Sequence, residues 1–316
     1  MNSEFDIVVV GSCFMDMLWY VPRVPVQGET MHATKFQVDF GGKASNQCIM
    51  AAKLGARVAM VAMVGNDRFG HDTIENFKKH GINTDFIKVN DQLSTGVTSI
   101  AVDDDGQPTF IGLAGANKAI TIDDIKQASN MIRSAPVLVC DKGIPLQIAL
   151  ETLKLGKELG AMTIFNPSPT IEKLSLEDYS YMDLLVINAS EGEGLTGIIV
   201  DSVETAKEAV KELHKKGTCK VVLTLGEDGA VFLDDNGDQE EIVSHTKANK
   251  VNAIDTTGAG DSLLGALAYF LACYPNLPFK EIVQRSVSVA SFTVTSCGVQ
   301  SSFPTRDELP PSLFTN

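Results

Sequence analysis

Short apolar segments alternate with longer segments of helical periodicity along most of the chain. Continuous apolar runs predict strands that are covered on both faces, and such runs occur at residues 6–11, 57–65, 136–140, 162–166, 183–188 and 220–226. Between them, apolar residues spaced three and four apart predict helices over residues 43–54, 70–80, 121–133, 145–159 and 202–216. This alternation predicts an α/β fold with a doubly wound, mostly parallel sheet and helices on both faces.

Two segments alternate polar and apolar residues instead, and they do not fit a doubly wound sheet. Residues 29–40 and 95–113 are each expected to form an antiparallel strand pair, and the second pair turns at Asp105-Gly106. We expect a small β-sheet that projects from one domain spanning residues 1–316, with lid segments at about 20–41 and 95–117. The pattern leaves open whether this sheet is a lid or a dimer surface.

Composition and charge argue against several classes of function. The chain has 316 residues, 44% of them hydrophobic, and a formal net charge of −14, which argues against nucleic acid or an anionic membrane surface as a partner. The six cysteines are scattered without a C-x-x-C pair, and the histidines lack metal-ligand spacing, which favours buried thiols over a zinc site. Because no apolar run approaches the ~20 residues that span a bilayer, a cytoplasmic protein is expected.

The segment DFGGKASNQ, from residue 39 to residue 47, places two glycines before a predicted helix. Gly41 and Gly42 allow the backbone to approach a ligand closely. Lys43 and Asn46 are three residues apart, so they share a helix face and can hydrogen-bond neighbouring hydroxyls of a small polar ligand. A purely structural glycine turn is the alternative interpretation.

Two further strand ends carry polar or glycine-rich segments. In VINASEGEG, residues 186–194, Asn188 and Glu191 have the spacing of a helix cap, and the same pair could touch a phosphate and a hydrated Mg²⁺. In TLGEDGA, residues 224–230, two glycines form either a hairpin corner or a backbone path along a nucleotide. The sequence leaves both pairs of alternatives open.

The segment DTTGAGD, from Asp255 to Asp261, is the most specific glycine-rich corner in the chain. Gly258 and Gly260 let backbone amides point at one spot, and the helix that follows adds its positive N-terminal end, so the corner predicts an anion site. It lacks the third glycine of a dinucleotide fingerprint and the Gly-Lys-Ser/Thr of a P-loop. An acid group, Asp261, stands at the mouth of this predicted anion site.

These segments resemble the signatures of PfkB-type carbohydrate kinases. GGKASNQ with VGNDRFG (64–70) is similar to the first signature of that family, and DTTGAGDSLLGA is similar to the second; GVQSSFP (298–304) resembles its ribokinase branch. The resemblance covers residues 5–314 and implies a ribokinase-like fold and ATP-dependent phosphorylation of D-ribose at O5. The alternatives are a relative that acts on another sugar, such as deoxyribose or fructose, or on a nucleoside, and a ligand-sensing relative without turnover.

Roles for individual residues follow from the resemblance alone. It implies that Asp261 is the general base and that the amides of Gly258, Ala259, Gly260 and Asp261 form the anion hole for the phosphoryl group. It places the sugar hydroxyls at Asp16, Gly42, Lys43, Asn46 and Asp261, and ATP at Asn188, Thr224, Leu225, Gly226 and Gly229, with Val287 beside the adenine. It places Mg²⁺ at Glu191 through water, and a K⁺ activator at Asp255, Thr257, Thr293, Ser296, Gly298 and Ser302. It also implies a homodimer.

One departure from the family pattern concerns the sugar. In VCDKGIP, residues 139–145, Gly143 stands where ribokinases carry a glutamate that contacts the sugar. Loss of a charge-assisted hydrogen bond typically costs about 1.5–3 kcal/mol. The sequence therefore predicts complete phosphoryl-transfer machinery and leaves the preference for ribose open.

Overall fold

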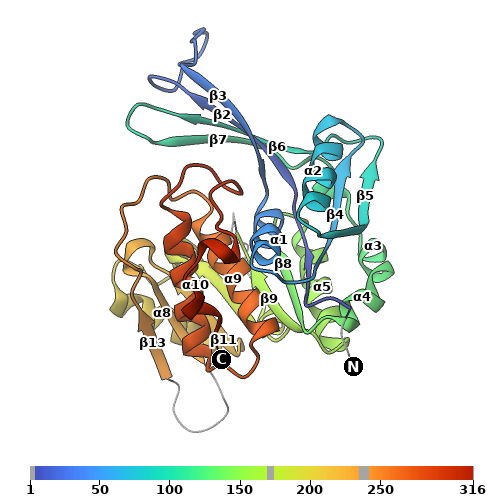
Figure 1. Ribbon diagram of the computed structural model, residues 1–316, viewed down its shortest axis with the longest axis vertical. Coiled ribbons are helices and arrows are strands. Elements are labelled where there is room, and N and C mark those ends of the chain that lie inside the picture. The colour runs from blue at the N-terminus through green and yellow to red at the C-terminus, as the bar shows by residue number, and fades with distance from the viewer. Residues whose placement is uncertain (1–3, 169–173, 235–241, 316) are drawn as a thin grey trace.

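A nine-stranded sheet forms the centre of the molecule (Figure 1). The computed structural model describes residues 4–168, 174–234 and 242–315. Within them the strands follow the order β13-β12-β11-β10-β9-β8-β1-β4-β5, with bounds β1 (Ile7–Val10), β4 (Val58–Gly65), β5 (Asn83–Asn90), β8 (Val137–Asp141), β9 (Met162–Asn166), β10 (Leu184–Asn188), β11 (Lys220–Thr224), β12 (Ala230–Asp234) and β13 (Ile242–Thr246). Neighbouring strands are parallel except that β12 is antiparallel to both β11 and β13. The predicted mostly parallel sheet is confirmed.

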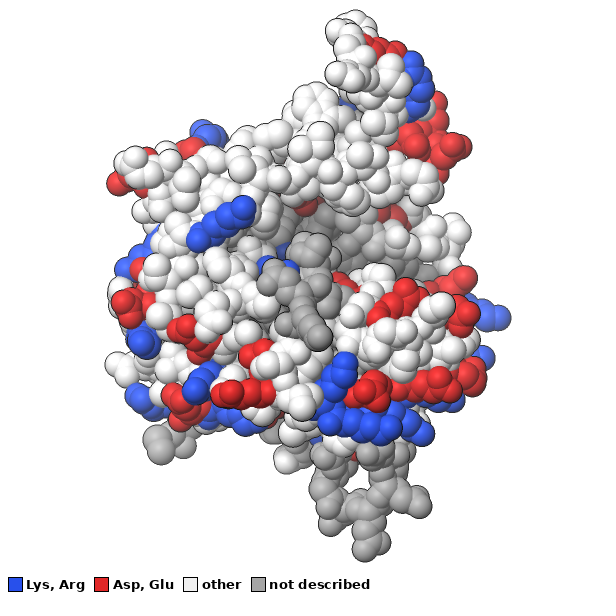
Figure 2. Space-filling view, turned by 180° about the vertical axis from the view of Figure 1, so that it is seen from behind, with Lys and Arg blue, Asp and Glu red and all other residues white. Residues whose placement is uncertain are grey.

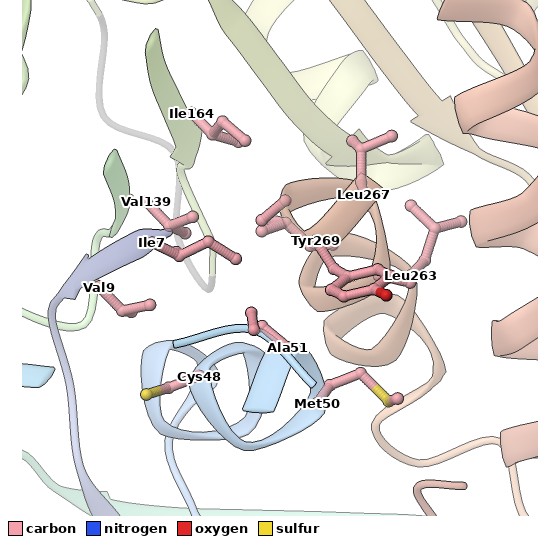
Figure 3. Packing of buried hydrophobic residues seen from close by; sticks show 14 of the residues in the cluster. Ile7, Val9, Cys48, Met50, Ala51, Val139, Ile164, Leu263, Leu267 and Tyr269 are labelled. Atoms are coloured by element: carbon pink, nitrogen blue, oxygen red, sulfur yellow. The ribbon is translucent and has the colours of Figure 1, made fainter. Parts of the chain in front are cut away.

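Helices cover both faces of this sheet, as the alternation predicted (Figure 1). One face carries α1 (Lys43–Lys53), α2 (Arg68–Lys79), α9 (Ala259–Cys273) and α10 (Phe279–Thr293); the other carries α3 (Ile122–Gln127), α4 (Ser129–Ser134), α5 (Leu146–Glu158), α6 (Leu176–Tyr179), α7 (Ala189–Thr196) and α8 (Val203–Lys215). Residues of β1 alternate between the two cores: Ile7 and Val9 pack toward α1 and α9 (Figure 3), and Val8 and Val10 pack on the opposite face.

The helix predicted over residues 121–133 is interrupted. α3 ends at Gln127 and α4 begins at Ser129, with Ala128 between them. The Ser129 hydroxyl donates to the Lys126 carbonyl, which is the kind of local side-chain bond that competes with helical backbone bonds. The predicted single helix was therefore wrong at its middle.

A second, smaller sheet projects from the body (Figure 1). This projecting sheet has the order β3-β2-β6-β7, with bounds β2 (Phe14–Tyr20), β3 (Lys35–Gly41), β6 (Gly96–Val102) and β7 (Pro108–Leu113). β6 and β7 form the predicted antiparallel pair, but residues 29–40 do not form a pair of their own. β3 pairs with β2, which precedes the predicted lid segment 20–41, and β2 pairs in parallel with β6. β2 was missed because its sequence, FMDMLWY, has too few polar residues to alternate.

On the rear surface, a hollow lies between the projecting sheet and the body (Figure 2). The chain passes from β1 into β2 through Gly11–Cys13, so the sheet edge where β1 ends lies beside the base of the projecting sheet. Among the described residues, no helix combines the length and hydropathy needed to cross a bilayer. The topology thus brings the carboxyl ends of the central strands and the projecting sheet to one side of the molecule.

Candidate active site

Asp261 lies in the first turn of α9, where two of the predicted glycine corners meet. Gly258 precedes the helix with a φ of +80°, and Asp261 is only 8% exposed. The Asn46 side chain donates from Nδ2 to Asp261 Oδ2 over 2.9 Å, and Gln47 donates from Nε2 to Oδ1 over 3.0 Å. The first turn of α1 therefore holds both oxygens of the carboxylate at the start of α9.

Gly42 fixes the start of α1 against the segment after β1. Its φ is +92°, and an added Cβ would lie 2.7 Å from the Ser12 carbonyl oxygen and 2.9 Å from the Phe14 amide nitrogen. No residue with a side chain fits there without moving the backbone. The close approach is the structural reason for the second glycine, and it positions Lys43 and Asn46 on the turn that follows.

A cleft of about 650 Å³ opens beside Asp261. Residues from four predicted segments line it: Lys43; Asn188 and Glu191; Thr224, Leu225 and Gly226; and Gly258, Gly260 and Asp261. Asn188 and Thr224 are paired in register at the ends of β10 and β11. The parallel sheet therefore gathers segments that lie far apart in the sequence around one cavity.

Asn188 and Glu191 form a capping box at the start of α7. The Glu191 amide donates to Asn188 Oδ1 over 2.9 Å, and the Asn188 amide donates to Glu191 Oε2 over 3.0 Å. Glu191 is buried, and both residues also line the cleft. The capping alternative is confirmed; a role of Glu191 toward Mg²⁺ stays a prediction.

The other residues assigned to ATP occupy different positions. Ala259 is the first residue of α9. Gly229 forms the turn between β11 and β12, where its φ is +86° and an added Cβ would lie 2.1 Å from the Thr246 carbonyl oxygen. Val287 is buried in the core on α10. Gly229 therefore has a structural role as the hairpin alternative predicted, and the contacts of Gly229 and Val287 with a nucleotide stay predictions.

Asp16 brings a second carboxylate from the projecting sheet toward Asp261. It is opposite Asp39 on β3 and opposite Thr98 on β6. The pKa of Asp16 is raised to about 6, first by burial and also by the charges of Asp39 and Asp261, against the opposing effect of a hydrogen bond from Thr98. The projecting sheet therefore places a second acid, with a pKa of about 6, near Asp261.

The segments that were assigned to a monovalent cation lie together. Asp255 accepts from the Thr257 amide over 2.9 Å and from the Gly298 amide over 3.0 Å. The Thr293 carbonyl accepts from the Ser296 amide over 3.3 Å, and the Ser302 hydroxyl donates to the Val299 carbonyl over 2.8 Å. Among the described residues, no group of three or more His, Cys, Asp or Glu could hold a metal ion. The oxygens gathered here are mainly carbonyl and hydroxyl oxygens.

Sequence reasoning missed three polar residues that complete the surroundings of Asp261. Gln47 contacts both Asp261 and Asn166, the last residue of β9, and Asn166 in turn donates to the Val186 carbonyl. Gln300 donates to Asn46 Oδ1 over 3.0 Å. Gln47 could have been found from its place in the first turn of α1, but Gln300 is 254 residues from Asn46 and gives no local signal.

Gly143 lies close to the side chains of Ser12 and Asp141. Asp141 is fully buried and accepts hydrogen bonds from the Ser12 amide, the Ser12 hydroxyl and the Ala44 amide. A Cβ added at Gly143 would lie 2.1 Å from Ser12 Oγ and 2.9 Å from Asp141 Oδ2. Asp141 is thus committed to the segment around Ser12 and to the start of α1.

Comparisons with known proteins agree with this arrangement. Residues 4–306 match the model of the pfkB family of carbohydrate kinases. A ribokinase of Mus musculus is 42% identical over 98% of this chain and 94% of its own, and a deoxyribokinase of Salmonella typhi is 33% identical over 98% and 99%. The structure of Arabidopsis thaliana ribokinase complexed with ribose and ATP superposes with a TM-score of 0.88 at 26% identity, covering 99% of both chains. Thermotoga maritima ribokinase superposes with a TM-score of 0.86 at 31% identity, covering 99% and 100%. This chain therefore belongs to the pfkB family of carbohydrate kinases.

Proposed function

We propose that this chain is a ribokinase, which transfers the γ-phosphoryl group of ATP to O5 of D-ribose and releases D-ribose 5-phosphate. The observation that carries the proposal is the buried carboxylate of Asp261, which lines the cleft at a helix N-terminus together with Gly258 and Gly260. The mouse and Arabidopsis relatives support ribose and ATP as the substrates.

The geometry suits a reaction that depends more on positioning than on a strong base. Phosphoryl transfer passes through a loose transition state, so the attacking hydroxyl needs alignment and its proton needs an acceptor late in the reaction. Asn46 and Gln47 each donate to one oxygen of Asp261, which fixes the orientation of the carboxylate. The helix end and the amides beside Gly258 and Gly260 offset the negative charge of the arriving phosphoryl group.

The two substrates would enter from different sides of the cleft. Lys43, Asn46 and Asp16 offer donors and an acceptor for sugar hydroxyls beside Asp261. Asn188, Thr224 and Gly226 line the cleft and would hold the phosphates and ribose of ATP. Asp261 lines the same cleft, where the sugar hydroxyl and the γ-phosphate would meet.

Two cations fit the residues around this site. Glu191 is buried at the edge of the cleft, where it would hold a hydrated Mg²⁺ that neutralises phosphate charge. Asp255 and the carbonyl and hydroxyl oxygens at Thr257, Thr293, Ser296, Gly298 and Ser302 would hold K⁺ beside the anion hole. Asp255 accepts hydrogen bonds from both the Thr257 and the Gly298 amides. A cation bound to Asp255 would therefore help to fix the backbone segment that leads into Gly258.

Potassium is expected to raise the turnover of the wild-type chain relative to sodium, and Asp255→Ala is expected to remove that difference. The substitution deletes the carboxylate that joins the two amides, so the segment before α9 loses its anchor. ADP release would be measured in KCl and NaCl at equal ionic strength. Equal wild-type rates in the two salts would contradict the cation site.

Deoxyribose is a second candidate substrate. Gly143 removes the acidic side chain that ribokinases direct at the sugar, and Asp141 does not restore it. The Salmonella relative named a deoxyribokinase has nearly full-length similarity to this chain. Both observations concern the sugar end of the cleft and leave the phosphoryl-transfer residues unaffected.

A coupled assay of ADP release tests the proposed function. The panel would contain D-ribose, 2-deoxy-D-ribose, D-fructose and nucleosides, each titrated at saturating ATP. Ribose is expected to give the highest kcat/KM. A higher kcat/KM with deoxyribose would support the second candidate, and no sugar-dependent ADP release from folded protein would contradict both.

Lowering the pH through about 6 is expected to raise the KM for ribose without changing the KM for ATP. The pKa of Asp16 is raised to about 6, first by burial, so below that pH the side chain loses the charge that favours a bound hydroxyl. Asp16→Asn should remove this pH dependence. The same change of pH is expected to raise the free energy of unfolding. Because the pKa of Asp16 is higher in the folded chain than in the unfolded chain, where it is near 3.8, protonation of Asp16 stabilises the folded chain; this contribution is complete below pH 3.8 and is lost as the pH rises through about 6.

The outer face of the projecting sheet supports a homodimer, which we also propose. Strand alternation and register place five side chains on the face opposite Asp16, and all five are exposed: Trp19, Phe36, Val38, Ile111 and Leu113. An exposed apolar face of this kind is typical of a protein interface. A monomer mass in sedimentation at the assay concentration would contradict the dimer. The face of the sheet that carries Asp16 is not part of this interface, so the proposed dimer is compatible with a lid role for that face.

A further inference from the structure

A line of buried side-chain amides connects α2 to Asp261. Asn76 on α2 donates from Nδ2 to Gln300 Oε1 over 2.9 Å. Gln300 donates from Nε2 to Asn46 Oδ1 over 3.0 Å, and to the Ser45 hydroxyl over 3.0 Å. Asn46 then donates to Asp261 Oδ2 over 2.9 Å. Each of these side chains is at least nine-tenths buried.

The direction of this line is set by its last member. An ionised carboxylate only accepts hydrogen bonds, so Asn46 must turn its NH₂ group toward Asp261 and its oxygen toward Gln300. Gln300 must then donate to that oxygen, which leaves its own oxygen for Asn76. The carboxylate at the end of the line therefore determines the orientation of both the Asn46 and the Gln300 amide.

We propose that Gln300 is a positioning residue for the phosphoryl transfer and acts through Asn46. Its amide holds the Asn46 oxygen away from the cleft and so keeps the Asn46 NH₂ group on Asp261 and beside the sugar. Without this donor, the Asn46 oxygen loses its hydrogen bond from Gln300, so the side chain is held only through its NH₂ group and is positioned less firmly on Asp261. This inference rests on the proposed function, because it assigns Asn46 to the sugar side of the reaction.

Gln300 also connects Asn46 to the loop in which Gln300 itself lies. Residues 298–303 form this loop, and it includes Gly298 and Ser302, which were assigned to the cation. Lys53 on α1 holds the loop through the carbonyls of Gln300 and Phe303, at 2.8 and 2.7 Å. The Gln300 side chain is thus a direct hydrogen-bonded link from this loop to Asn46, and hence to Asp261.

A double-mutant cycle tests the proposal. Gln300→Met keeps a side chain of similar length but removes the donor, and it is expected to lower kcat/KM for ribose by about 10-fold, mainly through a higher KM, with the KM for ATP unchanged. In an Asn46→Ala background, the same substitution should change kcat/KM by less than about twofold, because the group through which Gln300 acts is gone. Losses that multiply in the double variant would overturn the proposal, and so would an unchanged ribose KM in Gln300→Met.

Lys53→Met is the matched control for loop anchoring. Lys53 holds the same loop, but it donates to the backbone carbonyls of Gln300 and Phe303 and not to Asn46, so its effect and that of Asn46→Ala should multiply. If Gln300→Met does not fold, Asn76→Ala replaces it, with a smaller rise in ribose KM expected and the same lack of additivity with Asn46→Ala. The sugar panel with the wild-type chain distinguishes failure of the proposed function from failure of the proposed role of Gln300. If another sugar gives a higher kcat/KM, ribose is refuted as the substrate, and the mutant cycle is then run with that sugar.

Discussion

Asp261→Asn is expected to lower ribose turnover by about 10²–10⁴-fold, the usual contribution of a general base. Asparagine keeps the shape of the side chain but cannot accept the hydroxyl proton. In the wild-type chain, Asn46 and Gln47 each donate to one oxygen of Asp261. In the variant, the NH₂ group of the asparagine would face one of these two donors, so one of the hydrogen bonds would be lost. Steady-state kcat and calorimetric binding of ATP would be measured together, and ATP affinity should be retained.

Asp67→Asn provides the control for this substitution. Asp67 also lies at a helix N-terminus, where it accepts from the Gly70 amide at the start of α2. Asparagine caps helices about as well as aspartate. Its NH₂ group would lose the hydrogen bond that Asp67 accepts from the Thr95 amide, which costs stability, but no contact of Asp261 changes, so turnover should stay close to wild type. If Asp261→Asn retained turnover within about tenfold of wild type, proton acceptance would not be the role of Asp261.

The parts of the fold that could be predicted from sequence are those that local burial determines. Strands such as β1 and β10 are covered on both faces, so they appear as continuous apolar runs. The edge strand β5 has the sequence NTDFIKVN and is only partly buried, so it lacks that run and was missed. β2 was missed for a different reason: FMDMLWY does not alternate polar and apolar residues, and its place in the projecting sheet depends on pairing with β3 and β6.

The candidate site divides in the same way. Glycine corners and the Asn188–Glu191 spacing are local patterns, and the structure brings them to one cleft because parallel strands end at the same edge. Contacts between distant segments left no such pattern. Gln300 and Asn46 are 254 residues apart, and Asp141 and Ser12 are 129 apart, so only the folded chain shows that each pair is hydrogen-bonded.

Gly258→Ala is expected to lower turnover by about 10²-fold, comparable to the loss of one donor from an anion hole. The φ of Gly258 is +80°, and an added Cβ would lie 3.0 Å from Val299 Cγ1 and 3.1 Å from Phe303 Cε1. Relieving both the backbone strain and the close contacts moves the amides that lead into α9. The kcat for ribose and the free energy of unfolding would be measured for the same preparation.

Gly160→Ala separates backbone strain from catalysis. Gly160 follows α5 with a φ of +89°, and nothing lies within 4 Å of an added Cβ. Both substitutions therefore pay a similar conformational cost, about 1–2 kcal/mol for a left-handed residue. Gly160→Ala should lose that stability and keep full turnover, because no phosphate-facing amide moves. If both variants lost activity in proportion to their loss of stability, Gly258 would serve only the fold. If only Gly258→Ala lost activity, the backbone before Asp261 would be required for catalysis.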